Sequence, residues 1–129
     1  MRRRSTSATV SRVARTVLIV DDHPAFRSAA RALLNAAGFD VVGEAVDGAS
    51  ALDAVSELRP EIVLLDVQLP DIDGFAVAER LSKDGAQPAI VLTSSRSIAS
   101  LRWRLDANPG WSFIPKSELS GEALAAVVC

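Results

Sequence analysis

The stretch that decides the fold is Val17-Leu-Ile-Val-Asp-Asp-His-Pro24, together with Ile62-Val-Leu-Leu-Asp66 further along the chain. In both segments, four consecutive apolar residues end in an acidic residue. A strand that is apolar at every position, rather than at every second one, is typical of a parallel sheet covered by helices on both faces. The two segments therefore predict strands inside a parallel sheet, each followed by a carboxylate.

Outward from these two strands, segments of strand and helix character alternate. The first helical segment repeats its apolar face with a period of 3.6 residues, and Gly38 then marks its end. That face is made by Phe26, Ala29, Ala30, Leu33, Leu34 and Ala37. The expected strands and helices are, in order, Val17–Val20, Pro24–Ala37, Val41–Glu44, Ala49–Leu58, Ile62–Leu65, Phe75–Ser82, Ala89–Leu92, Ile98–Leu105, Ser112–Ile114 and Gly121–Val128. This order predicts an α/β fold, a doubly wound five-stranded parallel sheet of the flavodoxin-like kind with helices on both faces.

The size and composition fit one globular domain and argue against several classes of protein. The chain has 129 residues, of which 49% are hydrophobic and 23% charged, and its apolar runs fall short of the roughly 18 residues that a membrane helix needs. The single cysteine is Cys129 and the single histidine is His23. One cysteine and one histidine therefore argue against a disulfide framework, a thiolate zinc site and a Ser-His-Asp triad. We expect a reduced, cytoplasmic protein without membrane contact.

Charge divides the chain into a basic arm and an acidic body. Residues 1–16 hold five arginines and no acid, whereas residues 17–129 hold nine basic and sixteen acidic residues. We expect residues 1–15 to form a disordered arm and residues 16–129 to form the domain. The arm is interpreted first as a solvated tail, with a transit peptide or a weak tether to an acidic surface as alternatives. The acidic body is not expected to bind nucleic acid by itself.

Polar side chains follow four of the predicted strands. Asp21 and Asp22 follow the first strand, Asp66 the third, Thr93 the fourth and Lys116 the fifth. Because the carboxyl ends of parallel strands meet at one edge of the sheet, we expect these groups to converge. Taken alone, Asp22 is better explained as a cap of the first helix, but several carboxylates buried together need a cation. Carboxylate oxygens suit Mg²⁺, for which Mn²⁺ can substitute, and a carboxylate beside such an ion can act as a nucleophile toward phosphorus.

Four linked motifs carry a resemblance to a known family. They are Val17-Leu-Ile-Val-Asp-Asp-His-Pro24, Asp66-Val-Gln-Leu-Pro-Asp-Ile-Asp-Gly74, Thr93 after Ile-Val-Leu, and Phe113-Ile-Pro-Lys116 with Ser117 behind it. Over about residues 16–129 the chain resembles the receiver domain of two-component response regulators, most of all the receivers that precede a helix-turn-helix DNA-binding domain. It departs from the family pattern at Asp106-Ala-Asn-Pro-Gly-Trp111, which has one extra residue.

The resemblance implies a metal site and an acceptor. Asp66 would accept the phosphoryl group, Asp22 would bind Mg²⁺ directly, and Asp21 would bind it mainly through water. Gln68 would offer its backbone carbonyl to the metal, so that its side chain is free to vary.

The resemblance also implies a switch. Thr93 would move toward the phosphoryl group, Lys116 would pair with it, and the ring of Phe113 would report phosphorylation by turning inward or outward. Trp103 and Trp111 are interpreted equally as partner anchors or as packing residues. Arg96, Arg102 and Arg104 are interpreted as a solvated stripe on the fourth helix, or as a docking surface for a homodimer that forms on phosphorylation.

The function implied is a signalling switch that a histidine kinase or phosphotransfer protein phosphorylates, rather than an enzyme acting on a separate substrate. One alternative is a hydrolase or phosphotransferase that uses an aspartyl phosphate, but that class requires Asp-x-Asp after the first strand, where this chain has Asp21-Asp22. Another is a receiver-like scaffold used without phosphorylation, which would lack the acceptor, the acidic pair or the lysine. A dinucleotide site would need Gly-x-Gly-x-x-Gly at the same place.

Overall fold

The computed structural model describes residues 14–83, 88–95 and 102–128. Strands and helices alternate as the sequence predicts, and their bounds lie within two residues of the expected ones, apart from the predicted start of the fourth helix at Ile98, which lies outside the described residues. The elements are β2 (Thr16–Val20), α1 (Pro24–Ala36), β3 (Asp40–Ala45), α2 (Gly48–Leu58), β4 (Ile62–Asp66), α3 (Gly74–Lys83), β5 (Ala89–Ser94), α4 (Arg102–Asp106), β6 (Ser112–Pro115), the 3-10 turn η2 (Lys116–Glu118) and α5 (Gly121–Val128).

The five strands form one parallel sheet in the order β3-β2-β4-β5-β6. The chain moves from β2 to β3 on one side and then returns past β2 to β4 on the other, which places the switch in strand order between β2 and β4. In doubly wound sheets a ligand crevice lies beyond the carboxyl ends of the strands at such a switch. The predicted fold is confirmed, and it directs attention to the residues after β2 and β4.

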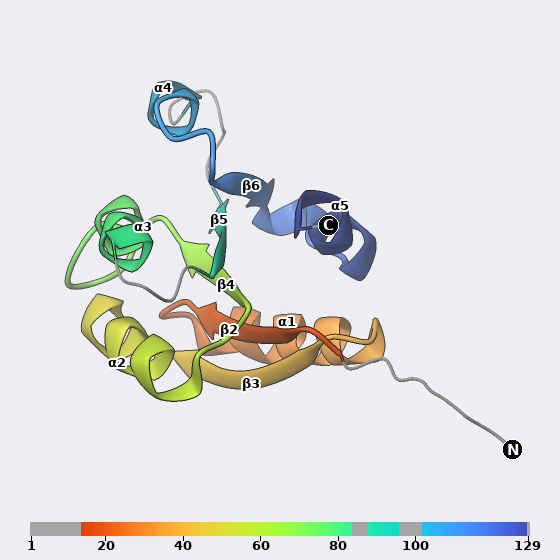
Figure 1. Ribbon diagram of the computed structural model, residues 1–129. Coiled ribbons are helices and arrows are strands. Elements are labelled where there is room, and N and C mark those ends of the chain that lie inside the picture. The colour runs from red at the N-terminus through yellow and green to blue at the C-terminus, as the bar shows by residue number, and fades with distance from the viewer. Residues whose placement is uncertain (1–13, 84–87, 96–101, 129) are drawn as a thin grey trace, which may run out of the picture.

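Helices cover both faces of the sheet, as Figure 1 shows, with α1 and α5 on one face and α2 and α3 on the other. The side chains of β2 alternate between the two cores, since Leu18 and Val20 pack with α2 and α3 whereas Val17 and Ile19 pack with α1 and α5. All four are at most 1% exposed. This two-sided burial explains why β2 is apolar at every position.

The apolar stripe of α1 is narrower than predicted. Ala30 and Leu34 are buried and Phe26 is half-buried, but Leu33 and Ala37 are exposed. The helix contacts the sheet along a single ridge, and the flanking apolar positions face outward. Its predicted end is confirmed, because Gly38 follows it with a φ of +99°, a conformation that favours glycine.

Three predictions fall partly or wholly outside the described residues. The predicted arm, residues 1–15, is described only at Ala14 and Arg15, where the guanidinium of Arg15 donates to the carbonyl oxygen of Val128 at 2.7 Å. Of the predicted fourth helix, Ile98–Leu105, the structure describes the part that belongs to α4, and Arg96 is not described.

Among the described helices, we find none with the length and apolarity to cross a membrane.

Candidate functional site

The carboxyl ends of β2 and β4 bring three aspartates together. Asp21 is fully buried and Asp66 is 3% exposed, whereas the side chain of Asp22 is 38% exposed. Each follows or ends a strand whose apolar residues are held in the core, so the backbone leaves the carboxylates little freedom. Within the described part of the chain, the N-cap of α1 is His23 and no side chain caps this end by a hydrogen bond. The alternative interpretation of Asp22 as a helix cap is therefore wrong.

Lys116 supplies positive charge to this cluster from the end of β6. Its Nζ lies 2.6 Å from Asp21 Oδ2 and 3.2 Å from Asp66 Oδ2, and its side chain is 13% exposed. The ammonium also lies 4.7 Å from the centre of the Phe26 ring. The predicted convergence of Lys116 with the two buried aspartates is therefore present, and the lysine bridges them.

The pKa values of the two buried carboxylates are shifted in opposite directions from the ordinary value of an aspartate. Burial raises the pKa of Asp66, and the nearby negative charge of Asp21 raises it further. Burial opposes ionisation of Asp21 as well, but its hydrogen bonds with Lys116 and His23 together outweigh that effect and lower its pKa. Desolvation acts against the charge of Lys116, yet its contacts with Asp21 and Asp66 raise its pKa overall. Lys116 is therefore a permanent cation at neutral pH, shared by two acids.

The loop after β4 is shaped closely around Asp66. The amide of Gln68 donates to Asp66 Oδ1 at 3.0 Å, and Gln68 pairs with Asp73 in an isolated antiparallel bridge. Gly74 starts α3 so near this loop that an added Cβ would lie 2.2 Å from the carbonyl oxygen of Asp66. Glycine is therefore required at this position. The amide of Gln68 contacts Asp66, whereas the role of its carbonyl oxygen as a metal ligand stays a prediction.

Thr93 and Phe113 lie on the strands beyond Asp66. Thr93 is the register partner of Asp66 across β4 and β5, and Phe113 is the register partner of Leu92 across β5 and β6. Thr93 is 1% exposed, and among the described residues its hydroxyl has no hydrogen-bond partner. A buried hydroxyl without a partner is unfavourable, so its position beside Asp66 indicates that the site is built to receive another polar group.

The carboxylate oxygens at the carboxyl ends of β2 and β4 fit a hard cation. Asp21, Asp22, His23 and Asp66 each offer one ligand atom, and these atoms all lie within 4.8 Å of one another. Carboxylate oxygens are the ligands preferred by Mg²⁺, whereas zinc sites are usually built from Cys and His. The three carboxylates, from Asp21, Asp22 and Asp66, therefore fit the ion type that the sequence predicts.

Several contacts at the site were not anticipated from the sequence. The ring of His23 lies against both aspartates of the acidic pair, with Nδ1 at 2.9 Å from Asp21 Oδ1 and 3.2 Å from Asp22 Oδ1. Arg104, interpreted from the sequence as part of a solvated or docking stripe, instead pairs with Asp73 at 2.8 Å. The contacts of His23 could have been predicted from its position directly after the acidic pair in the sequence. The Arg104 contact depends on how α4 packs and leaves no trace in local sequence.

The two tryptophans differ in environment. Trp111 is half-buried, and its ring packs against that of Phe75 in a tilted arrangement with the ring centres 6.0 Å apart. Its Nε1 donates to Ser82 Oγ at 3.2 Å, so it is a packing residue. Trp103 is 71% exposed. The guanidinium of Arg104 lies 3.9 Å above the Phe75 ring and 5.9 Å from the ring of Trp103.

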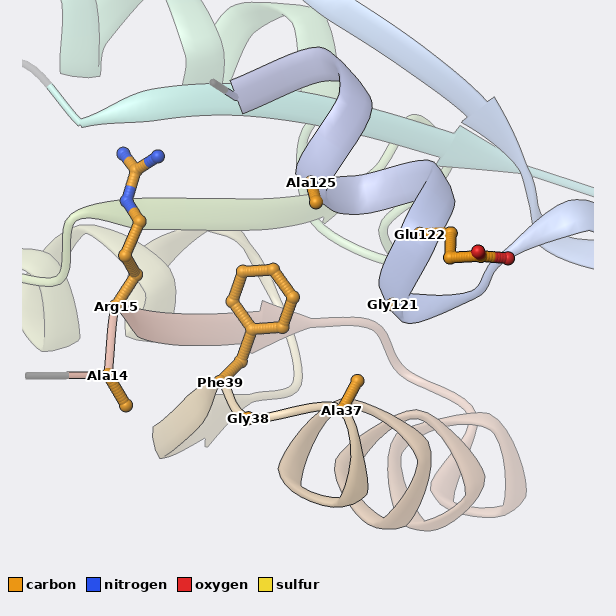
Figure 2. A pocket seen from close by; sticks show the side chains of 8 residues that line it. All are labelled: Ala14, Arg15, Ala37, Gly38, Phe39, Gly121, Glu122 and Ala125. Atoms are coloured by element: carbon orange, nitrogen blue, oxygen red, sulfur yellow. The ribbon is translucent and has the colours of Figure 1, made fainter. Parts of the chain in front are cut away.

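A separate hollow of about 470 Å³ lies at the opposite end of the sheet from the aspartates, beside the amino-terminal end of β2 (Figure 2). Its lining is mostly small or apolar, with Ala37, Gly38 and Phe39 on one side and α5 on the other. Arg15 and Glu122 are the charged residues in it. It lacks the convergent acids of the strand-end site and is not where the predicted chemistry would occur.

Comparison with known proteins gives one family. Residues 17–127 match the response regulator receiver domain. The chain is similar to the transcription regulator BvgA of Bordetella pertussis, with 39% identity over 111 residues, and to a transcriptional regulator of Pseudomonas aeruginosa, with 37% identity over 110 residues. Each match covers 85% of this chain and 53% of the relative, so the chain spans about half the length of these curated relatives.

Solved structures agree with the fold. The signal receiver domain of the response regulator NarL from Mycobacterium tuberculosis has a TM-score of 0.77 and 29% identity, covering 91% of this chain and 98% of that one. A DNA-binding response regulator of the LuxR family from Staphylococcus aureus has a TM-score of 0.80 over 89% of this chain and 99% of the other, but at 18% identity it supports the fold alone.

Proposed function

The chain belongs to the response regulator receiver domain family, and we propose that within it Asp66 accepts the phosphoryl group that sets the state of the switch. The observation that carries this assignment is the contact of one lysine, Lys116, with Asp21 and Asp66 beside the unpartnered hydroxyl of Thr93. Among the described residues, this group of side chains combines a nucleophile, a counter-charge and a free donor at one place.

Asp66 is the nucleophile of the proposed reaction. A carboxylate oxygen of Asp66 forms a bond to phosphorus as the bond between phosphorus and the donor, a histidine nitrogen of a kinase or phosphotransfer protein, breaks. Lys116 then has its ammonium beside the new acyl phosphate, and the Thr93 hydroxyl donates the hydrogen bond for which it has no present partner. Phe113, on the strand beside Thr93, would respond to that movement.

Asp22, Asp66 and the backbone carbonyl of Gln68 would hold Mg²⁺, with Asp21 acting through water. When bound, the ion neutralises charge on the phosphoryl oxygens. The chain's own part is to keep Asp66 in place through the Gln68 amide and to exclude water by burying Asp21 and Asp66. Lys116 balances the acids in the absence of the ion.

We further propose a cytoplasmic location, a histidine kinase or phosphotransfer protein as partner, and a phosphorylation-dependent homodimer as output. The relatives named as transcription regulators support a role in controlling transcription through a DNA-binding domain outside this chain. We propose no reaction on a separate substrate, in keeping with a domain that acts on its own aspartate. Residues 1–15 are proposed to be an arm outside the receiver domain.

The test is phosphorylation by a small-molecule phosphodonor such as acetyl phosphate, followed by intact-mass measurement. Wild-type protein should gain one phosphoryl group with Mg²⁺ and much less with EDTA. Asp66→Asn should gain none, whereas Asp53→Asn, which changes an exposed aspartate of α2, should behave as wild type. A phosphoryl group on folded Asp66→Asn would refute the assignment.

A further inference from the structure

The imidazole of His23 occupies the mouth of the acidic cluster. It is the single histidine of the chain, and its Nδ1 lies 2.9 Å from Asp21 Oδ1 and 3.2 Å from Asp22 Oδ1. The backbone amide of His23 also donates to Asp21 Oδ1 at 2.8 Å, so both the main chain and the ring are held at this carboxylate. The ring is nevertheless 65% exposed and so accessible to an ion from solvent.

The distance from His23 Nδ1 to Asp22 Oδ1, 3.2 Å, has the spacing of neighbouring ligands on one metal ion. In octahedral coordination with bonds of about 2.1 Å, adjacent ligand atoms are separated by about 3.0 Å and opposite ones by about 4.2 Å. The distance to Asp21 Oδ1, 2.9 Å, is that of a hydrogen bond, which keeps the ring beside the site. The ligand atoms of His23 and Asp66 lie within 4.8 Å of each other, so a shift of at most about 0.6 Å is needed to keep them within the opposite spacing.

In the described part of the chain, the polar contacts of the His23 side chain are all with the acidic pair, Asp21 and Asp22. His23 is the N-cap of α1, yet the cap is made without a side-chain hydrogen bond. An independent sign that this cluster receives ligands is the hydroxyl of Thr93, which is 1% exposed and lacks a hydrogen-bond partner among the described residues. The acidic cluster is thus more than a group of exposed carboxylates.

Imidazole changes which cations the cluster should prefer. Mg²⁺ favours oxygen ligands, whereas imidazole nitrogen suits transition metals, whose affinity rises from Mn²⁺ through Co²⁺ to Ni²⁺. We propose that His23 is an imidazole ligand in the cation site and gives the receiver a preference for transition-metal ions over Mg²⁺. This proposal rests on the cation site proposed above and adds a nitrogen donor to it.

The test uses Co²⁺ alone and Mg²⁺ alone as probes, on protein without a polyhistidine tag. Co²⁺ binding is followed by its visible absorption, and Mg²⁺ binding by calorimetry. Because the chain has one histidine, NMR of its ring reports on His23 without ambiguity. A ring N–H resonance carrying a large contact shift requires a cobalt–nitrogen bond, and we expect it in wild-type protein.

His23→Phe keeps a ring at this exposed position and removes both nitrogens. We expect it to weaken Co²⁺ binding by roughly tenfold or more, as loss of a ligand does, and to leave Mg²⁺ binding within about twofold of wild type because Mg²⁺ depends on the oxygens. Asp22→Asn should weaken both ions. Arg31→Gln, which changes a surface residue of α1 away from the cluster, should change neither.

The two proposals fail in different ways. If Mg²⁺ binds in an Asp22-dependent manner but His23→Phe leaves Co²⁺ affinity unchanged, His23 is not a ligand and only the further inference is overturned. If neither ion depends on Asp22, the cation site itself is wrong and the inference is overturned with it. Should His23→Phe not fold, the wild-type NMR experiment decides, since absence of the contact-shifted ring resonance with bound Co²⁺ overturns the inference.

Discussion

Single charges control the stability of the strand-end site. Asp21 is fully buried and Asp66 nearly so, and Lys116 lies between them with Nζ at 2.6 Å and 3.2 Å from their oxygens. A buried carboxylate that loses its counter-charge must either stay ionised at a cost or take up a proton. Lys116 therefore has a structural effect as well as its proposed role beside the phosphoryl group.

Lys116→Met should destabilise the protein by roughly 2 to 4 kcal/mol at pH 7. This estimate begins below the range of about 3 to 5 kcal/mol for breaking a buried ion pair, because Asp66, whose pKa is already raised by burial, can relieve the imbalance by binding a proton. Urea unfolding measures the change. Lys83→Met, at an exposed lysine of α3, should shift stability by less than about 0.5 kcal/mol. Equal effects of the two substitutions would argue against a shared counter-charge.

Asp22→Asn should uncouple stability from Mg²⁺. Wild-type protein at ten times the dissociation constant should gain about 1.4 kcal/mol of unfolding free energy from the ion, and the variant should gain almost none because a ligand is lost. Urea midpoints with Mg²⁺ and with EDTA give both values. An equal gain in wild type and variant would mean that Asp22 does not bind the ion.

Individual helices are held by contacts that cross between elements. Glu44, on β3, accepts from Arg27 at 2.9 Å and from Arg31 at 2.7 Å, both on α1. Asp71, in the loop after β4, accepts from the amides of Gly48 and Ala49 in the first turn of α2. The loop that follows Asp66 is therefore held to a neighbouring helix through Asp71.

Glu44→Gln should lower stability at neutral pH by about 1 kcal/mol, the upper value for surface ion pairs. Hydrogen bonds from Arg31, opposed in part by burial, hold the pKa of Glu44 below its ordinary value of 4.5. The folded state thus binds fewer protons than the unfolded state, so this stabilisation is complete above pH 4.5 and is lost as the pH falls through the lower folded pKa. Denaturation curves of both proteins should converge in acid. A difference that grows as the pH falls would refute this explanation.

Gly74→Ala should disturb the start of α3 and the loop that positions Asp66. Its Cβ would lie 2.2 Å from the carbonyl oxygen of Asp66, which is backbone and has little freedom to shift. We expect a loss of roughly 2 to 4 kcal/mol together with slower phosphorylation by the small-molecule donor. The matched control is Gly110→Ala, whose Cβ would have no described atom within 4 Å. A neutral Gly74→Ala would show that the loop is more plastic than described.

At the scale of the whole molecule, the fold could be predicted from the sequence because the pattern of apolar residues along the chain determines the strands and helices. Four-residue apolar strands could be buried on both sides only in a parallel sheet, and the residues after them had to meet at one edge. The convergence of Asp21, Asp66 and Lys116 followed from that geometry. Contacts between side chains of separate helices and loops could not be predicted, because they depend on the rotation of each element about its axis.

Arg104 illustrates this limit. Its spacing on the fourth helix predicted a solvated or docking stripe, but packing turns it toward Asp73 and the ring of Phe75. Similarly, the exposed positions Leu33 and Ala37 show that a 3.6-residue period fixes a helix but not the width of the face that it buries. The proposed homodimer surface must therefore be formed without Arg104 as a free charge.

The central claim is that Asp66 carries the phosphoryl group, and direct mapping of the modified residue tests it best. Protein phosphorylated by acetyl phosphate with Mg²⁺ is reduced with borohydride, which converts an aspartyl phosphate to homoserine, and is then digested and sequenced by tandem mass spectrometry. We predict homoserine at position 66 and unmodified aspartate at positions 21, 22, 71 and 73. Homoserine at any of those four positions, with Asp66 intact, would contradict the account.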